Sequence, residues 1–209
     1  MKTRQPVLDF LGKDFLLSVS TVLSINNKSI EESPNFTIEI ANVNHVFWLN
    51  EICDTTLSSA LARGTGISGR SPELLEEKMK KGEAVIAFAS DGTWAGFSFI
   101  SAWNNGECVS NSGLIVAPQF RHTGLAKKIK QKIFWLSRQK YPKAKVFSLT
   151  TGLAVMKINH ELGFEPVTYS ELTTDEAFWE NCKSCVNCSI LMNKERKNCL
   201  CTAMLYNPK

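Results

Sequence analysis

The chain has 209 residues, 44% of them hydrophobic and 21% charged, so it is long enough to fold as one globular domain without disulfide bridges. Its formal net charge of +4 suits an anionic ligand but is too small to indicate a nucleic-acid-binding protein. The most apolar stretch, residues 7–25, is interrupted by Asp9, Lys13 and Asp14, which argues against a membrane span and a signal peptide. We therefore expect a cytoplasmic protein whose seven cysteines are thiols or metal ligands.

Residues 1–35 form an N-terminal extension. The apolar residues between positions 7 and 23 fit one face of a helix, whereas residues 26–35 are polar, contain Pro34 and are typical of a linker. This extension can pack on the rest of the chain or on a second copy of it, so a homodimer stays open.

From residue 36 onward, strand and helix patterns alternate. Alternating apolar and polar residues predict a strand, and Ser71 followed by Pro72 predicts the start of a helix. Asp91-Gly92 is typical of a hairpin turn. The predicted strands are residues 36–40, 84–89, 93–103, 107–116, 146–150, 164–169 and 202–206. The predicted helices are residues 43–61, 71–82, 123–140 and 153–162. This order predicts an α+β fold with a mixed, mostly antiparallel sheet flanked by helices.

In the helix over residues 123–140, the apolar positions form one face. Most of its lysines, Lys127, Lys128, Lys130 and Lys132, are expected to lie off that face.

Residues 114–126 are the most informative segment, because an apolar strand passes through a short loop directly into a helix. The first turn of a helix has unpaired N–H groups and the positive end of the helix dipole, which together favour phosphate. Gly124 lets an anion approach the backbone, Ala126 is small, and Arg121 can add a charged contact. The alternative is an ordinary strand–helix turn in which Gly124 only serves packing.

The loop Arg121-His122-Thr123-Gly124-Leu125-Ala126, the strand Leu114-Ile115-Val116 and residues 159–164 resemble the GNAT superfamily (Gcn5-related N-acetyltransferases) over residues 36–170. The resemblance implies an N-acyltransferase that uses acetyl-CoA or another acyl-CoA and lets an amine attack the thioester directly. It also implies that the amides of residues 121–126 hold the pyrophosphate and that the backbone of residues 114–116 pairs with the pantetheine arm. The strands over residues 107–116 and 146–150 should part and leave a cleft.

The resemblance places Asn159 where the family usually has a tyrosine that protonates the leaving thiolate. Asparagine donates a hydrogen bond but cannot act as an acid. Either Asn159 stabilises the thiolate, or a neighbour or water supplies the proton; His160 points elsewhere on the helix. No general base is identified, although Glu107, Cys108 and Ser110 lie on a suitable strand.

The acceptor is expected to bind near the helix pair after the first strand, where Arg63 and Arg70 suit a carboxylate, unless both are simply exposed to solvent. Residues 69–76, 149–151 and 163–167 resemble the acyltransferase domain of bacterial N-acetylglutamate synthase. This narrower resemblance implies transfer of an acetyl or succinyl group to the α-amino group of glutamate, in arginine biosynthesis. Gly152 replaces the arginine that follows Thr-Thr in those enzymes, and no amino-acid-kinase domain is present.

Residues 171–209 form a cysteine-rich tail that we expect to pack on the acyltransferase domain. Cys182, Cys185, Cys199 and Cys201 have spacings that can surround a structural Zn²⁺ ion, with Cys188 as the spare thiol. Reduced thiols or a redox-sensitive cluster are the alternatives.

Two other functional classes remain open. A non-catalytic acyl-CoA-binding module would keep the loop around Gly124 and lack an acid, as the asparagine at position 159 allows. A zinc-ribbon interaction protein would use the cysteine tail to bind a partner. We expect a small-molecule amine as the acceptor, and neither nucleic acid nor a membrane as a partner.

Overall fold

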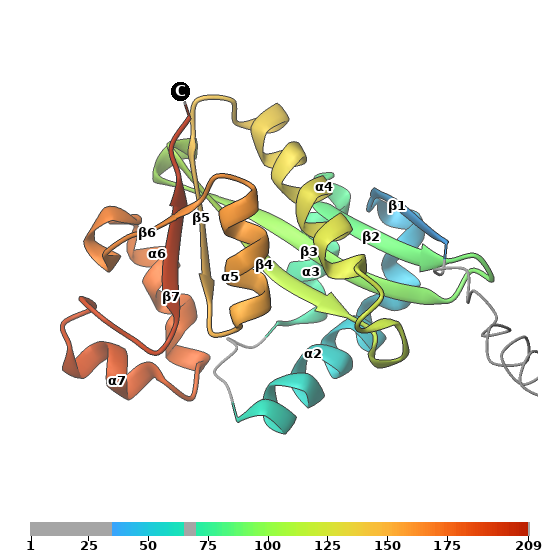
Figure 1. Cartoon of the computed structure of the whole chain (residues 1–209), viewed down its shortest axis with the longest axis horizontal. Helices are drawn as coiled ribbons and strands as arrows, with labels where there is room; N and C mark the ends of the chain where they lie inside the picture. Colours follow the sequence, from blue (N-terminus) through green and yellow to red (C-terminus); the bar gives the residue numbers. More distant parts are fainter. Residues whose placement is uncertain (1–34, 65–69, 209) are drawn as a thin grey trace, which may run out of the picture. The chain divides into compact units, whose positions relative to one another are not determined.

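The computed structural model describes residues 35–64 and 70–208, which build a seven-stranded sheet with helices on both faces (Figure 1). The strand order is β1-β2-β3-β4-β5-β7-β6. The strands are β1 (Phe36–Ile40), β2 (Ala84–Ala89), β3 (Trp94–Trp103), β4 (Cys108–Val116), β5 (Lys145–Thr150), β6 (Glu165–Pro166) and β7 (Thr202–Tyr206). Neighbouring strands are antiparallel, except that β4 and β5 run parallel. The predicted α+β class with a mostly antiparallel sheet is thus confirmed.

The α-helices are α2 (Leu49–Arg63), α3 (Pro72–Lys80), α4 (Leu125–Lys140), α5 (Leu153–Glu161), α6 (Glu176–Glu180) and α7 (Cys188–Asn193). Short 3-10 helices are η1 (Val43–Trp48), η2 (Asn104–Gly106), η3 (Pro118–Phe120), η4 (Tyr169–Glu171) and η5 (Asn181–Ser184). No helix within residues 35–64 and 70–208 is long and apolar enough to cross a membrane.

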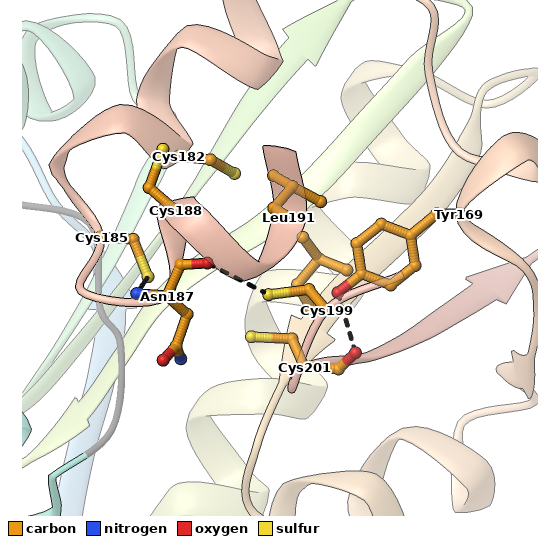
Figure 2. A pocket seen from close by; sticks show the side chains of 9 residues that line it. Tyr169, Cys182, Cys185, Asn187, Cys188, Leu191, Cys199 and Cys201 are labelled. Carbon is orange, nitrogen blue, oxygen red and sulfur yellow. Dashed lines mark hydrogen bonds between the residues drawn. The ribbon is translucent and has the colours of Figure 1, made fainter. Parts of the chain in front are cut away.

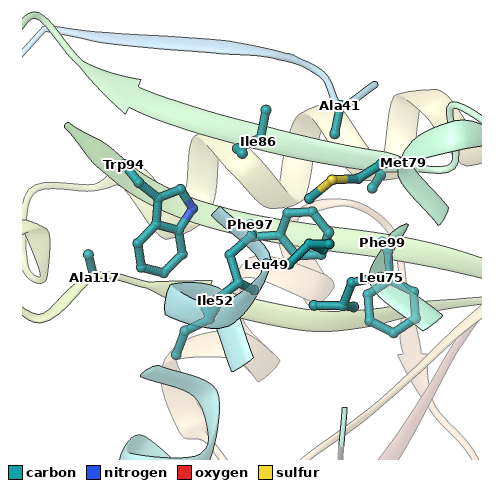
Figure 3. Packing of buried hydrophobic residues seen from close by; sticks show 12 residues of the cluster. Ala41, Leu49, Ile52, Leu75, Met79, Ile86, Trp94, Phe97, Phe99 and Ala117 are labelled. Atoms are coloured by element: carbon teal, nitrogen blue, oxygen red, sulfur yellow. The ribbon is translucent and has the colours of Figure 1, made fainter. Parts of the chain in front are cut away.

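Helices α2 and α3 cover one face of the sheet at its β2–β3 side (Figure 3). Ile52 of α2 and Met79 of α3 pack against Phe97 and Phe99 of β3. Farther along the same face, α6 and α7 pack on β5 and β7, and Phe178 of α6 lies 5.0 Å from the ring of Phe147. The tail after residue 171 therefore contributes to a core cluster.

Helices α4 and α5 cover the opposite face (Figure 1). Ile129 and Ile133 of α4 are fully buried, as the apolar periodicity predicts. Lys130 lies off that face as expected, yet only 1% of this lysine is exposed. Helix α4 has a second covered flank, where Phe134 packs against Phe164, and Lys130 lies one turn before Phe134 on that flank.

Two predicted elements have different extents in the structure, because their local backbone conformation is not that of a continuous helix or strand. The helix predicted over residues 43–61 is the 3-10 helix η1 followed by α2. The strand predicted over residues 164–169 shrinks to two residues, since Pro166 has no N–H for the ladder and Thr168 begins a capped 3-10 turn. The N-terminal extension and most of the loop over residues 63–69 lie outside the described residues.

Candidate functional site

A groove opens between β4 and β5, as the sequence predicts. The two strands pair only where Cys108–Ser110 of β4 face Lys145–Phe147 of β5. Beyond these residues they part and leave a cavity of about 380 Å³, a size typical of ligand pockets. Its walls include Ser112, Leu114 and Ile115 of β4, together with Ser148, Leu149 and Thr150 of β5.

A β-bulge in β4 shapes the same wall. Phe97 of β3 faces Ile115, whereas Phe99 faces Ser112, so β4 has one extra residue between these pairs. Gly113 in the bulge has φ +63°, and an added Cβ would lie 2.5 Å from the ring of Phe99. A glycine is therefore required where the strand bends beside the groove.

The loop between β4 and α4 presents a row of backbone amides. Among the described residues, none of the amides of His122, Thr123, Gly124, Leu125 and Ala126 donates a hydrogen bond to the protein. Both His122 (φ +67°) and Gly124 (φ +82°) have left-handed conformations. An added Cβ at Gly124 would meet nothing within 4 Å. Amides at a helix start, in a loop of this kind, form a concave site for an anion. These five amides are not consumed within the described fold, which is what the predicted pyrophosphate site requires. The sixth predicted amide, that of Arg121, donates to the carbonyl oxygen of Pro118 at 3.3 Å.

Arg121 is engaged inside the protein. Its Nη2 donates to Ser59 Oγ of α2 at 2.7 Å, and its Nε donates to the carbonyl oxygen of Val116 at 3.4 Å. The side chain thus ties the loop to α2. In this arrangement the guanidinium is engaged and the five amides are not, so a contact between Arg121 and a phosphate stays a prediction.

The structure places Asn159 away from the groove. Its side chain is fully buried, and Nδ2 lies 3.6 Å from Met204 Sδ of β7. Asn159 Oδ1 has no hydrogen-bond partner among the described residues. The side chain of His160 is exposed, with Nδ1 at 3.8 Å from Glu165. A catalytic role for Asn159 stays a prediction, to which this packing adds no support.

The other strand residues considered as bases differ in position. Burial raises the pKa of the Cys108 thiol, whose Sγ lies 3.8 Å from the carbonyl oxygen of Leu172. Ser110 does line the groove, and its Oγ accepts from Trp103 Nε1 at 2.9 Å. Neither arrangement creates a strong base.

Both predicted acceptor arginines line the groove. The guanidinium of Arg70 lies over the ring of Phe99 at 5.2 Å from its centroid. Burial lowers the pKa of Arg70, but arginine starts so high that the group stays charged at neutral pH. The groove therefore has positive charge on its α2–α3 side, where the acceptor was expected.

Two polar residues at the point where the strands part were not singled out from the sequence. Lys130 and Asn111 both line the groove and are 1% and 6% exposed. Asn111 donates through Nδ2 to Ser137 Oγ at 2.7 Å, and its Oδ1 has no partner among the described residues. One feature of the sequence could have indicated the burial of Lys130. Phe134 lies one turn after Lys130, outside the first apolar face of α4, so this second flank of the helix also packs against the interior.

The five cysteines of the tail surround a second, small cavity (Figure 2). Its lining residues are Leu149, Tyr169, Cys182, Cys185, Asn187, Cys188, Leu191, Cys199 and Cys201. Burial, then the neighbouring thiols, raise the pKa of Cys182 to about 11 and that of Cys201 to about 12. The amide of Asn187 donates to Cys185 Sγ at 3.4 Å. Three of these cysteines, Cys182, Cys185 and Cys201, also line the large groove.

As arranged, the thiols do not form a metal site. No group of three or more histidine, cysteine, aspartate or glutamate residues in the described part of the chain has the geometry to hold a metal ion. The structure therefore gathers the predicted ligands Cys182, Cys185, Cys199 and Cys201 around one cavity, while zinc binding stays a prediction.

Comparison with known proteins identifies the fold. No family model matches the chain, and no curated protein matches its sequence. Solved structures do match. N-acetylglutamate synthase from Neisseria gonorrhoeae, complexed with coenzyme A and N-acetyl-glutamate, aligns with a TM-score of 0.60 at 18% identity. The alignment covers 84% of this chain and only 35% of that enzyme.

Two further structures match most of their own length. A GNAT family acetyltransferase from Staphylococcus aureus has a TM-score of 0.59 at 13% identity, over 84% of this chain and 100% of its own. A GNAT superfamily phosphinothricin acetyltransferase from Sinorhizobium meliloti, in complex with acetyl-CoA, has a TM-score of 0.54 at 13% identity, over 84% and 89%. The mixed sheet, the parted strands and these matches agree: the chain has the fold of the GNAT acetyltransferases, N-acetylglutamate synthase among them.

Proposed function

We propose that the protein is an N-acyltransferase that takes an acyl-CoA as co-substrate and transfers an acetyl or succinyl group to a primary amine. The observation that carries this proposal is the row of five amides, His122 to Ala126, that the described fold leaves without acceptors. These amides lie shortly after the end of β4, and the second half of β4 lines the groove. An anion-binding site and a groove for the remainder of the molecule are the two features that a nucleotide-linked thioester needs.

The groove suits the pantetheine arm because its walls are strand edges. Beyond Ser110 and Phe147, the facing edges of β4 and β5 no longer pair with each other. Backbone groups on such edges can bond to the amides of the arm, much as an added strand would. Backbone donors there can also stabilise the oxyanion that forms when an amine attacks the thioester carbonyl. The site then acts chiefly by holding the amine and the thioester in contact.

For the acceptor, we propose a small carboxylate-bearing amine, with the α-amino group of glutamate as the first candidate. Arg63 and Arg70 support it, because both line the groove and arginine pairs with carboxylates through two parallel hydrogen bonds. The Neisseria structure, which has the same fold, contains N-acetyl-glutamate. A place in arginine biosynthesis would follow only if glutamate is the acceptor.

Thiol release from acetyl-CoA and from succinyl-CoA, measured against a panel of amino acids and simple amines, tests both proposals. We expect release with acidic amino acids and a KM for the acceptor that rises at least tenfold in Arg70→Gln. Arg196→Gln, which removes a partly exposed arginine that pairs with Glu176 outside the groove, is the matched control and should leave KM unchanged. Release without preference for acids would remove the acceptor proposal alone. CoA binding without release for any amine would favour a non-catalytic acyl-CoA-binding module.

We also propose that Cys182, Cys185, Cys199 and Cys201 bind a structural Zn²⁺ ion after small movements of their side chains. Support comes from the shared cavity and from the Asn187 amide, whose bond to Cys185 Sγ would favour a thiolate. Metal analysis of protein purified under reducing, chelator-free conditions should give about one zinc per chain. The content should fall in Cys185→Ser and persist in Cys53→Ser, which alters a cysteine of α2. Zinc-free wild-type protein would contradict the proposal.

A further inference from the structure

Lys130 occupies an unusual position for a lysine. It lies in the second turn of α4, is 1% exposed and lines the groove. Its Nζ is 3.5 Å from Ser148 Oγ, the limit of a hydrogen bond, and 5.4 Å from the centroid of the Phe164 ring. No carboxylate pairs with it among residues 35–64 and 70–208. Burying an ammonium group without a counter-charge is unfavourable, so the position calls for an explanation.

The position coincides with the point where the strands part. Phe147 is the last residue of β5 that pairs with β4, and Ser148 follows it. Asn111 follows Ser110, the last such residue of β4, and its Oδ1 has no partner among the described residues. The first unpaired residue of each strand and Lys130 from α4 therefore border the groove together.

Lys130 can supply what Asn159 cannot. An amide side chain cannot give up a proton at neutral pH, whereas an ammonium group can. Asn159 is also buried against Met204 and does not line the groove. Burial lowers the pKa of Lys130 from 10.5 to about 7, so both protonation states are populated near neutral pH, as an acid in this role needs.

Titratable groups on the neighbouring elements do not compete for this role. On α5, Glu161 pairs with Lys127 at 2.7 Å and His160 lies beside Glu165. On β7, the ring of Tyr206 packs against Phe134 and lies under the guanidinium of Arg138. The lowered pKa of Lys130 has burial as its cause, and no ion pair links Lys130 to a carboxylate among the described residues.

We infer that Lys130 is the proton donor to the leaving thiolate of the acyl-CoA, a role that rests on the acyl transfer proposed above. The neutral amine attacks the thioester carbonyl carbon and forms the C–N bond. The C–S bond then breaks, and its electron pair stays on sulfur. Lys130 gives its ammonium proton to that sulfur, which leaves as the CoA thiol. The new amide nitrogen loses its extra proton to water, and Lys130 regains one from water.

The test compares Lys130→Met and Lys130→Arg with wild type in steady-state acyl transfer from pH 6 to 9. Arginine keeps the charge but does not release a proton in this range. We expect kcat to fall about 100-fold in both variants. The KM for acyl-CoA should stay within about threefold, because the anion-binding amides are untouched. The decline of wild-type kcat above about pH 7 should disappear. Lys132→Met, a partly exposed lysine two residues further on in α4 that does not line the groove, should behave like wild type.

Each outcome decides a different question. CoA binding measured by calorimetry shows that each variant is folded, independently of turnover. A Lys130→Met enzyme that keeps the wild-type kcat and pH profile would overturn the role of Lys130 and leave the acyltransferase proposal standing. A change confined to the acceptor KM would also overturn it, since it would make Lys130 a binding residue. Absence of turnover in the wild type with every amine would instead count against the proposed function.

Discussion

Gly124 is the residue on which anion binding depends most directly. It opens α4 with φ +82° beside amides that have no acceptor within the described fold. Asparagine and aspartate tolerate this conformation better than other non-glycine residues. Because the two side chains have similar shapes and only aspartate is charged, comparing them separates the effect of a negative charge from that of backbone strain. A carboxylate at this point would face the pyrophosphate.

We therefore expect Gly124→Asp to weaken the binding of CoA at least tenfold and Gly124→Asn to weaken it less. Gly92 provides a matched control, because it has φ +83° and equally open surroundings in the β2–β3 turn. Gly92→Asp should leave the affinity unchanged. Isothermal titration calorimetry at constant salt measures the CoA affinity of each of the three variants. Equal affinities in the three variants would contradict an anion site at the start of α4.

The burial of Lys130 also leads to a prediction about how stability depends on pH. In the unfolded chain its pKa is near 10.5, and in the folded protein burial lowers it to about 7. Between these values the unfolded chain binds more protons, so this residue destabilises the fold progressively as the pH falls from 10.5 to 7. Below about pH 7 the effect is constant.

Lys130→Met removes this cost and should raise the melting temperature at pH 7. The advantage over wild type should shrink as the pH approaches 10, because the wild-type lysine then becomes neutral in both states. Thermal unfolding followed by circular dichroism from pH 6 to 10 measures the difference in melting temperature between Lys130→Met and wild type. A difference between the two proteins that does not change with pH would show that the lysine is not buried as a titrating group.

At the residue scale, the sequence predicts those features of the site that depend on residues close together in the chain. The loop 121–126 joins its strand and helix within a few residues, so its unpaired amides could be expected from the pattern alone. Lys130 could not, because α5 and Phe164, more than twenty residues later, bury it. Position 159 was assigned by resemblance, and the packing of Asn159 on Met204 of β7 depends on an equally distant strand.

At the scale of elements, strands with clear alternation or turn signals were predicted to the residue, among them β1, β2 and β7. The bulge in β4 was not, because it appears only as a shift of register between β3 and β4. A single glycine within an apolar run gives little warning of such a shift.

The bulge yields a prediction about Gly113. Alanine there would keep φ at +63° and place Cβ 2.5 Å from Phe99, which itself belongs to the core and lies under Arg70. We expect Gly113→Ala to lose about 2–4 kcal/mol of unfolding free energy from backbone strain and overpacking. Gly92→Ala, which carries the strain without the clash, should lose only about 1 kcal/mol. Urea denaturation compares them, and equal losses would mean that Phe99 moves aside freely.

At the scale of the whole molecule, the order of strands in the sheet could not be predicted from the sequence. β7 lies between β5 and β6, although more than thirty residues and four short helices separate it from β6. Ala203, Met204 and Leu205 are at most 3% exposed. The tail is thus part of the sheet that carries the groove, and its last strand supports β5 on the side away from β4.

Leu205→Asp should therefore prevent stable folding, because it places a carboxylate between Phe147 and the helices of the tail. Leu200→Asp, five residues earlier, should be tolerated, since that side chain is 62% exposed. Soluble yield and far-ultraviolet circular dichroism distinguish the two variants. A folded Leu205→Asp protein would show that β7 can detach without loss of the sheet.

The three cysteines common to the thiol cavity and the large groove give the site a chemical reactivity of its own. A ligand that enters the groove and carries a mild electrophile would meet Cys182, Cys185 and Cys201. The raised pKa values of Cys182 and Cys201 keep these two thiols protonated and slow to react. Covalent modification of the groove should therefore be slow at Cys182 and Cys201, and a zinc ion held by the cysteines of the tail would occupy the thiols that such a ligand meets.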